Sequence, residues 1–139
     1  MRVARVAVES ENPEIAAFKA LADWARKNVP GALKKTRFFG FNDPCPEPGQ
    51  TVYRYEAWMS IDEQTGGTDD VSVIVHPGGK YAVVTTSLAE ISDVWHWLDR
   101  AVKENGYEYG TGPALEEMLT DPIDTPFDRA VVKLYLPVK

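Results

Sequence analysis

The sequence contains one cysteine and two histidines, and it has no apolar run long enough to span a bilayer. The single Cys45 excludes a disulfide within the chain, and its place between two prolines matches no nucleophile or metal motif. Basic residues are also scarce, because 15 Lys and Arg oppose 21 Asp and Glu and leave a net charge of −6. Such a charge repels nucleic-acid phosphates. Residues 1–8 lack the apolar core of a secretory signal. We therefore expect a cytoplasmic protein that binds neither nucleic acid directly nor a membrane.

The composition that remains is that of an ordinary globular domain, and its most informative feature is an internal repeat. At 139 residues, with 44% hydrophobic and 26% charged residues, the chain fits one domain with a sizeable core. Asp43-Pro44 recurs as Asp121-Pro122, 121 − 43 = 78 residues later. Strand-like stretches begin at matching distances on both sides, at Val3 and Tyr81 and again at Thr51 and Arg129. Because two copies cannot build a solenoid, we expect the halves to close on each other as one pseudo-symmetric domain.

The first half predicts a strand, a helix and two further strands. Valines alternate from Val3 to Val8, and Asn12-Pro13 has the chemistry of a helix start. The apolar stripe of this helix consists of Phe18, Leu21, Ala22, Ala25 and Val29, and Pro30-Gly31 predicts the helix end. Two strands are then predicted over residues 37–41 and 51–60.

The second half repeats this order after a connecting segment. Residues 62–70 are acidic, contain Gly66-Gly67 and lack the ligand spacing of a calcium loop, so we expect a mobile linker there. A bridging strand follows over residues 71–75. The second half predicts a strand from Tyr81, a helix opened by a capping box at Ser87 and Glu90, a stop at Asn105-Gly106 and strands over 114–119 and 129–138. Module one then covers about residues 1–61, the linker and bridging strand about 62–78, and module two about 79–139.

Several segments resemble one known family. In the second half they are Gly79-Lys80-Tyr81-Ala82-Val83, Gly112-Pro113-Ala114-Leu115-Glu116, Asp121-Pro122 and Leu134-Tyr135-Leu136-Pro137-Val138, and in the first half Phe41-Asn42-Asp43-Pro44 and Arg54-Tyr55-Glu56-Ala57. Together they resemble the gyrase-inhibitor-like (GyrI-like) effector-binding family of bacterial proteins. The resemblance implies an α+β fold of two strand-helix-strand-strand modules. Their antiparallel sheets would flank a groove that binds lipophilic, often cationic, small molecules.

The resemblance also designates candidate site residues. Glu116 matches the family's pocket glutamate, and Met118 stands where the family commonly has tyrosine. Alternation along the strand puts Glu116 and Met118 on one face, and we assign Leu115 and Leu119 of the other face to the side that packs on the helix. Glu116 would then point into the groove.

The last strand supplies further candidates. Leu134 and Leu136 suit the core, which turns Lys133 and Tyr135 toward the same groove, and the offset of 78 maps Lys133 onto Tyr55. The predicted ligand-binding residues are Glu116, Tyr135, Tyr55, Met118 and Trp97. Four of them have a plainer interpretation: a solvated acid for Glu116, ordinary half-buried sheet aromatics for the two tyrosines, and a cover over a neighbour for Trp97.

The remaining aromatic and basic residues receive structural roles. Trp58 and Trp95 are assigned to the core. His76 and His96 share no metal-ligand spacing with an acid or a cysteine, so we expect surface histidines, no metal, no haem and no other cofactor. Met118 and Lys133 both weaken the expected preference for cations.

The sequence thus predicts a free-standing small-molecule binding protein for a hydrophobic, cationic or aromatic compound, of the multidrug-binding kind. Glu116 would be the counter-charge and the tyrosines the stacking surfaces. Two alternatives stay open. Glu116, with its pKa raised by desolvation, could activate water in a hydrolase of strained, cyclopropane-bearing electrophiles. The chain could also act as an inhibitory partner of DNA gyrase, as the family name suggests.

Overall fold

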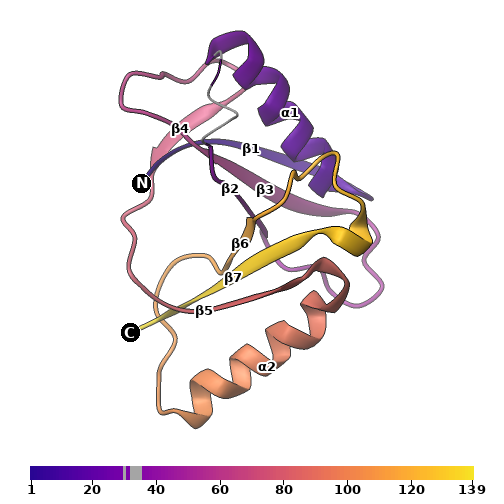
Figure 1. The fold of residues 1–139 in the computed structure, drawn as a ribbon, viewed down its shortest axis with the longest axis vertical. Helices are drawn as coiled ribbons and strands as arrows, with labels where there is room; N and C mark the ends of the chain where they lie inside the picture. The colour runs from indigo at the N-terminus through magenta and orange to yellow at the C-terminus, as the bar shows by residue number, and fades with distance from the viewer. Residues whose placement is uncertain (30, 32–35) are drawn as a thin grey trace. The chain divides into compact units, whose positions relative to one another are not determined.

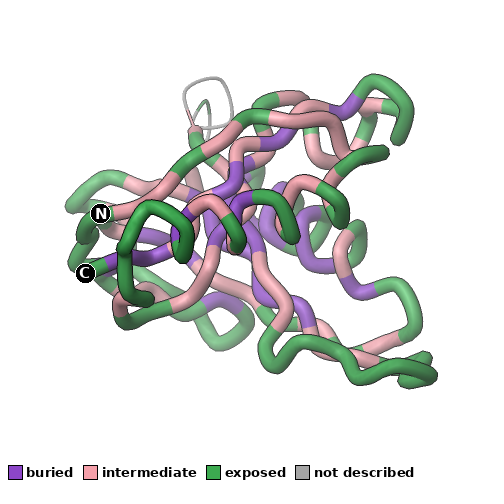
Figure 2. The backbone as a smooth tube through the Cα atoms, turned by 90° about the horizontal axis from the view of Figure 1, so that it is seen from below, coloured by how far each residue is buried: buried purple, intermediate pink, exposed green. Residues whose placement is uncertain are grey.

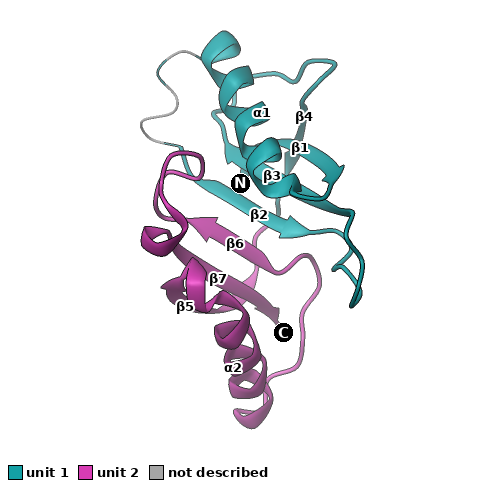
Figure 3. Ribbon diagram, turned by 90° about the vertical axis from the view of Figure 1, so that its right-hand side faces the viewer, with its two compact units in different colours: residues 1–77 teal, residues 78–139 magenta. Residues whose placement is uncertain are grey.

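Seven strands and two α-helices make up the part of the chain that the structure describes, residues 1–29, 31 and 36–139 of a computed structural model. The chain divides into two units, Met1–Pro77 and Gly78–Lys139 (Figure 3). The strand pairings within both units are antiparallel. The α+β class predicted from the sequence is confirmed.

Unit 1 contains one helix on a four-stranded sheet. Its elements are β1 (Arg2–Ser10), α1 (Pro13–Asn28), β2 (Phe38–Asn42), β3 (Tyr53–Ser60) and β4 (Ser72–Val75). The strand order is β4-β1-β3-β2, and α1 covers one face of β1 and β3 (Figure 1). Pro13 opens α1 as predicted, although the Asn12 side chain makes no capping hydrogen bond.

The core of unit 1 forms where the apolar stripe of α1 meets this sheet. Phe18 lies 5.9 Å from the Tyr55 ring and 6.2 Å from the Phe38 ring, both edge-on. Of the predicted stripe, Phe18, Leu21, Ala22 and Ala25 are buried in α1, and Val29 lies just past the helix end. Figure 2 shows the buried parts of the backbone in purple. The helix ends at Asn28, and the predicted stop at Pro30 lies outside the described residues.

Residues 62–70 are held by hydrogen bonds to the rest of unit 1. The Asp62 carboxylate accepts from the backbone N–H of Thr65 at 2.8 Å, and Arg2 donates to the Asp62 carbonyl at 2.8 Å. Hydrogen bonds from the Thr65 hydroxyl and from the Thr65 and Gln64 N–H groups lower the pKa of Asp62. The Trp24 indole N–H donates to the Thr68 hydroxyl at 3.0 Å. The loop is therefore anchored to both β1 and α1.

Unit 2 has one helix on a three-stranded sheet. Its elements are β5 (Lys80–Ser87), the 3₁₀ turn η2 (Leu88–Glu90), α2 (Ile91–Glu104), β6 (Leu115–Met118), the 3₁₀ turn η3 (Phe127–Arg129) and β7 (Val131–Val138). The order is β6-β7-β5 (Figure 1). Leu98 of α2 packs on Val132 and Leu134 of β7.

The ends of α2 differ in how well the sequence predicts them. Gly106 has a φ of 78°, so the predicted left-handed stop is confirmed. The capping box at Ser87 is wrong, because η2 precedes the helix and the Ser87 side chain makes no capping hydrogen bond. Neither described helix is both long and apolar enough to cross a membrane.

The 78-residue offset holds for the first strand of each unit and fails by one residue in the last. Val6 pairs with Ala57, and Val84 pairs with Leu134. The first strands are thus 84 − 6 = 78 residues apart and their partners 134 − 57 = 77. Because side chains alternate along a strand, a slip of one residue reverses the face. Tyr55 therefore corresponds to Val132 in unit 2, and the mapping onto Lys133 is wrong.

Candidate functional site

The helix-free face of unit 2, the side of its sheet opposite α2, carries an acidic side chain from β6. Leu134 packs toward α2, so its neighbours Lys133 and Tyr135 point to the opposite face. Antiparallel partners share a face, and Glu117 is paired with Lys133. Glu117 therefore lies on the same face as Tyr135. The predicted common face of Lys133 and Tyr135 is confirmed.

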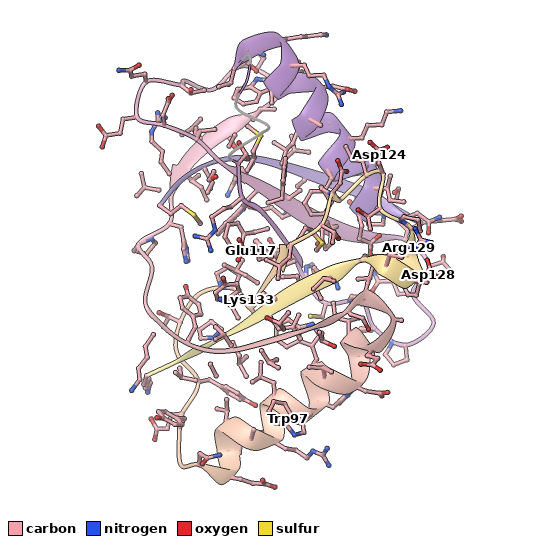
Figure 4. The ribbon with its side chains drawn as sticks, in the orientation of Figure 1. Trp97, Glu117, Asp124, Asp128, Arg129 and Lys133 are labelled. Atoms are coloured by element: carbon pink, nitrogen blue, oxygen red, sulfur yellow. The ribbon has the colours of Figure 1, made fainter. Side chains whose placement is uncertain are left out.

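These side chains form a compact cluster, called here the Glu117 cluster: Glu117, Tyr135, Tyr81 and Lys133. Glu117 is 6% exposed, and its Oε1 accepts a hydrogen bond from the Tyr135 hydroxyl at 2.6 Å. The Tyr81 ring stands edge-on to Tyr135 at 5.8 Å, and burial raises the pKa of Tyr81. The Lys133 ammonium lies 5.4 Å from the Tyr135 ring centre. Figure 4 shows Glu117 and Lys133 on the neighbouring strands β6 and β7.

The chemistry of this cluster suits an apolar cation. A carboxylate removed from water is costly unless it is hydrogen-bonded or paired with a charge, and here a tyrosine hydroxyl supplies one hydrogen bond. The faces of tyrosine rings attract cations within about 6 Å, and Lys133 already stands at this distance from Tyr135. The face thus combines a negative charge with aromatic surface.

The face predicted for Glu116 is wrong. Glu116 is paired with Leu134 and Met118 with Val132, and Met118 packs on the core beneath α2. Both side chains therefore point to the face that carries α2, while Leu115 is buried on the opposite face. The apolar character of Leu115 and Leu119 suggests the helix side, but the register with β7 puts the buried Leu115 on the helix-free face. Whether Glu116 binds a ligand stays a prediction.

Tyr55 and Trp97 occupy very different surroundings. Tyr55 is 2% exposed and packs against Phe18, on the face of the unit 1 sheet that carries α1. Its contacts are those of a core residue. Trp97 is 52% exposed on α2 (Figure 4). Trp58, at 3% exposed, is a core residue as predicted.

Sequence reasoning missed a second buried acid, on the helix-free face of unit 1. Glu56 is 3% exposed and accepts from the Trp58 indole N–H at 2.8 Å, and the Arg5 guanidinium lies 3.4 Å away. Alternation along β3 places Glu56 and Trp58 on one face and could have revealed the pair. The Arg5 guanidinium compensates the charge of Glu56.

The prediction of a surface position for His76 is also wrong. His76 is 9% exposed, and its ring lies 5.2 Å from the Trp58 ring. Burial, and then the nearby N-terminal ammonium group, lower the pKa of His76. His96 is exposed, as expected.

Comparison with known proteins assigns the chain to a family. A family model described as integron-associated effector binding protein (Cass2) matches residues 1–138. The chain belongs to this family. It is a GyrI-like family, which confirms the resemblance drawn from the residues. Membership in an effector-binding family indicates that the protein binds a small molecule.

The structural comparison supports the fold of this effector-binding protein. An uncharacterized conserved protein from Listeria innocua has a similar crystal structure, with a TM-score of 0.69 and 12% sequence identity. The match covers 100% of this chain and 88% of that one. No curated protein matches the chain.

Unit 1 of this effector-binding protein also contains a hollow of about 370 Å³ between α1 and residues 68–71. Trp24 and Val71 form apolar parts of its wall, and Asp23, Lys27 and Asp70 are charged residues along it. These three are exposed, so water already solvates their charges. The Glu117 cluster differs because its carboxylate is buried.

Proposed function

We propose that this effector-binding protein recognises a hydrophobic aromatic cation on the helix-free face of unit 2. Glu117 supplies the counter-charge, and Tyr135 and Tyr81 supply aromatic surface. The observation that carries the proposal is the 6% exposed Glu117 carboxylate, hydrogen-bonded at 2.6 Å to the Tyr135 hydroxyl.

The energetic argument rests on desolvation. A carboxylate with little access to water attracts a cation more strongly than a surface carboxylate does, because the effective dielectric constant is lower. Each well-placed aromatic face adds on the order of 0.5 to 2 kcal/mol. Lys133 is a competing cation in the same cluster, so a ligand has to displace or bypass its ammonium group.

Glu116 gives a matched control for this assignment. It is adjacent in sequence, it is the acid that the family resemblance designates, and it lies on the opposite face of β6. The hydrolase and gyrase-inhibitor alternatives stay predictions.

The experiment compares Glu117→Gln and Glu116→Gln by isothermal titration calorimetry. The probes are a lipophilic aromatic cation and a neutral aromatic compound of similar ring size. We expect Glu117→Gln to weaken binding of the cation at least about tenfold, equivalent to about 1.4 kcal/mol, and to leave the neutral compound unaffected. Glu116→Gln should leave the affinity for both probes unchanged.

The opposite pattern would contradict the proposal. If Glu116→Gln alone removed cation binding, the acid designated by the resemblance would be the counter-charge and the Glu117 cluster would have a structural role. If neither substitution distinguished the cation from the neutral compound, no counter-charge role would remain for β6.

A further inference from the structure

The outer edge of the first strand is paired with a further strand in unit 1 but not in unit 2. In unit 1 the edge of β1 is paired with β4, from Arg2 opposite Val75 to Arg5 opposite Ser72. The corresponding strand of unit 2 is β5, which pairs with β7 and ends the strand order. By the 78-residue offset, the segment equivalent to Arg2–Arg5 is Lys80–Val83. Within the described chain, no strand occupies this edge of β5.

The free edge of β5 lacks the usual protection against pairing. It is eight residues long, contains no proline and has one charged residue, Lys80, at its beginning. Natural edge strands are commonly short, or carry proline or central charges, which prevent pairing with another chain. In unit 1 the edge strand beside β1 is β4, which has only four residues. The edge of β5 is therefore suited to accept a further strand.

We propose that β5 is the interface of a twofold dimer, in which β5 of a second copy pairs with it in antiparallel orientation. When a strand pairs with its own twofold copy, both partners come from the same face of the unit, so their numbers add to an even sum because side chains alternate. A pair centred on Val83 meets this condition and places Lys80 opposite Thr86 and Tyr81 opposite Thr85. No two like charges then face each other. Val83, which is 48% exposed, would be covered by its own counterpart.

An exposed tryptophan lies on the same side of unit 2. Tyr109 donates to Asp99 of α2 and bridges to Val138, on the side of β7 away from β5. The Asp99 flank of α2 therefore faces away from β5. Trp97 is turned by about 200° from Asp99 around the helix and lies on the flank above β5. At 52% exposed, Trp97 offers apolar surface to the α2 of a neighbouring copy (Figure 4).

A second copy fits this edge better than a head-to-tail arrangement. Pairing of β5 with β5 of a second copy about a twofold axis uses the β5 edge of each copy and gives a closed dimer. Pairing of β5 with β4 of the next copy would instead continue into a filament. The inference depends on strand pairing and exposure alone and is independent of the ligand.

The test is the oligomeric state of Val83→Lys, measured by sedimentation velocity over a range of protein concentrations. Two like charges at the centre of the paired edges should raise the dimer dissociation constant at least about tenfold. Val75→Lys is the matched control, because Val75 is 70% exposed on β4, the edge strand of unit 1. It should dimerise as the wild type does.

A cysteine variant keeps the test decisive if lysine at position 83 impairs folding. In a Cys45→Ser background, Val83→Cys should form a covalent dimer on mild oxidation, since central antiparallel partners lie within disulfide distance. Val75→Cys in the same background should stay uncrosslinked. A wild type that stays monomeric at every concentration would overturn the proposal. So would a dimer that is as stable in Val83→Lys as in the wild type, together with a Val83→Cys variant that forms no crosslink.

Discussion

At the scale of single residues, two adjacent glutamates on β6 have different surroundings. Glu117 is buried against Tyr135, whereas Glu116 shares a face with Leu134. Sequence alone presents them as equivalent acids, and the resemblance favoured Glu116. The partner strand decides between the faces, because the register with β7 determines which glutamate meets the aromatic side chains.

The hydrogen bond between Tyr135 and Glu117 gives a prediction about stability. Tyr135→Phe removes the hydroxyl that donates to the buried carboxylate at 2.6 Å. We expect the free energy of unfolding to fall by about 1–3 kcal/mol, because a buried acceptor loses one of its hydrogen-bond donors. Urea denaturation measures the change.

Tyr109→Phe is the control for this substitution. Tyr109 is 46% exposed and donates to the exposed side of α2, so its loss should change the stability by no more than about 0.5 kcal/mol. If Tyr135→Phe and Tyr109→Phe lowered the free energy of unfolding equally, the hydrogen bond from Tyr135 to Glu117 would contribute no more to stability than an exposed one.

At the scale of elements, the ring of Tyr55 on β3 lies over a position of β2 that has no side chain. Gly40 is paired with Ala57, and the ring of Tyr55, whose own partner is Asn42, lies over Gly40 on the side covered by α1. A Cβ atom at position 40 would lie 2.6 Å from Tyr55 Cε1 and would overlap the hydroxyl end of the ring. The glycine thus makes room for the ring of Tyr55, which the strand pattern predicts in a ligand groove.

The close packing predicts that Gly40→Ala destabilises the protein by about 1–3 kcal/mol, because the buried Tyr55 ring has to shift. Thermal unfolding measures the loss. Gly66→Ala is the matched control, since a Cβ there meets no atom within 4 Å. Combining Gly40→Ala with Tyr55→Leu should give less than the sum of the two single losses. A full sum would mean that the two positions do not interact.

At the scale of the whole molecule, contacts distant in sequence set the surroundings of ionisable groups. The His76 backbone N–H donates to the Met1 carbonyl at 2.7 Å, and the N-terminal ammonium donates to the His76 carbonyl at 2.6 Å. These bonds hold the His76 ring beside Trp58. No sequence pattern in the residues around His76 predicts that its side chain is buried.

The position of His76 predicts a pH dependence of stability. Its pKa is lowered in the folded protein from the ordinary value of 6.5. The unfolded chain therefore takes up a proton first as the pH falls below 6.5, and this shifts the equilibrium toward unfolding. The contribution of neutral His76 to the free energy of unfolding is therefore complete above pH 6.5. It is lost as the pH falls from 6.5 through the lowered pKa of His76 in the folded protein.

We expect the stability advantage of wild type over His76→Gln to shrink as the pH decreases from about 8 to about 5.5. Denaturation curves at several pH values provide the measurement, and His96→Gln on the exposed side of α2 controls for the loss of a histidine. A constant difference between wild type and His76→Gln across this range would contradict the prediction.

The local pattern of residues was enough to establish the α+β class, the order of strands and helices, the core stripe of α1 and the stop at Gly106, because helix and strand periodicity and turn chemistry act over a few neighbouring residues. The motifs also led to the correct family. The faces of Glu116, Tyr55 and His76 required the folded chain, because they depend on partner strands and on contacts up to 75 residues away. A one-residue difference in offset between the units reverses a strand face, and only strand pairing reveals that difference.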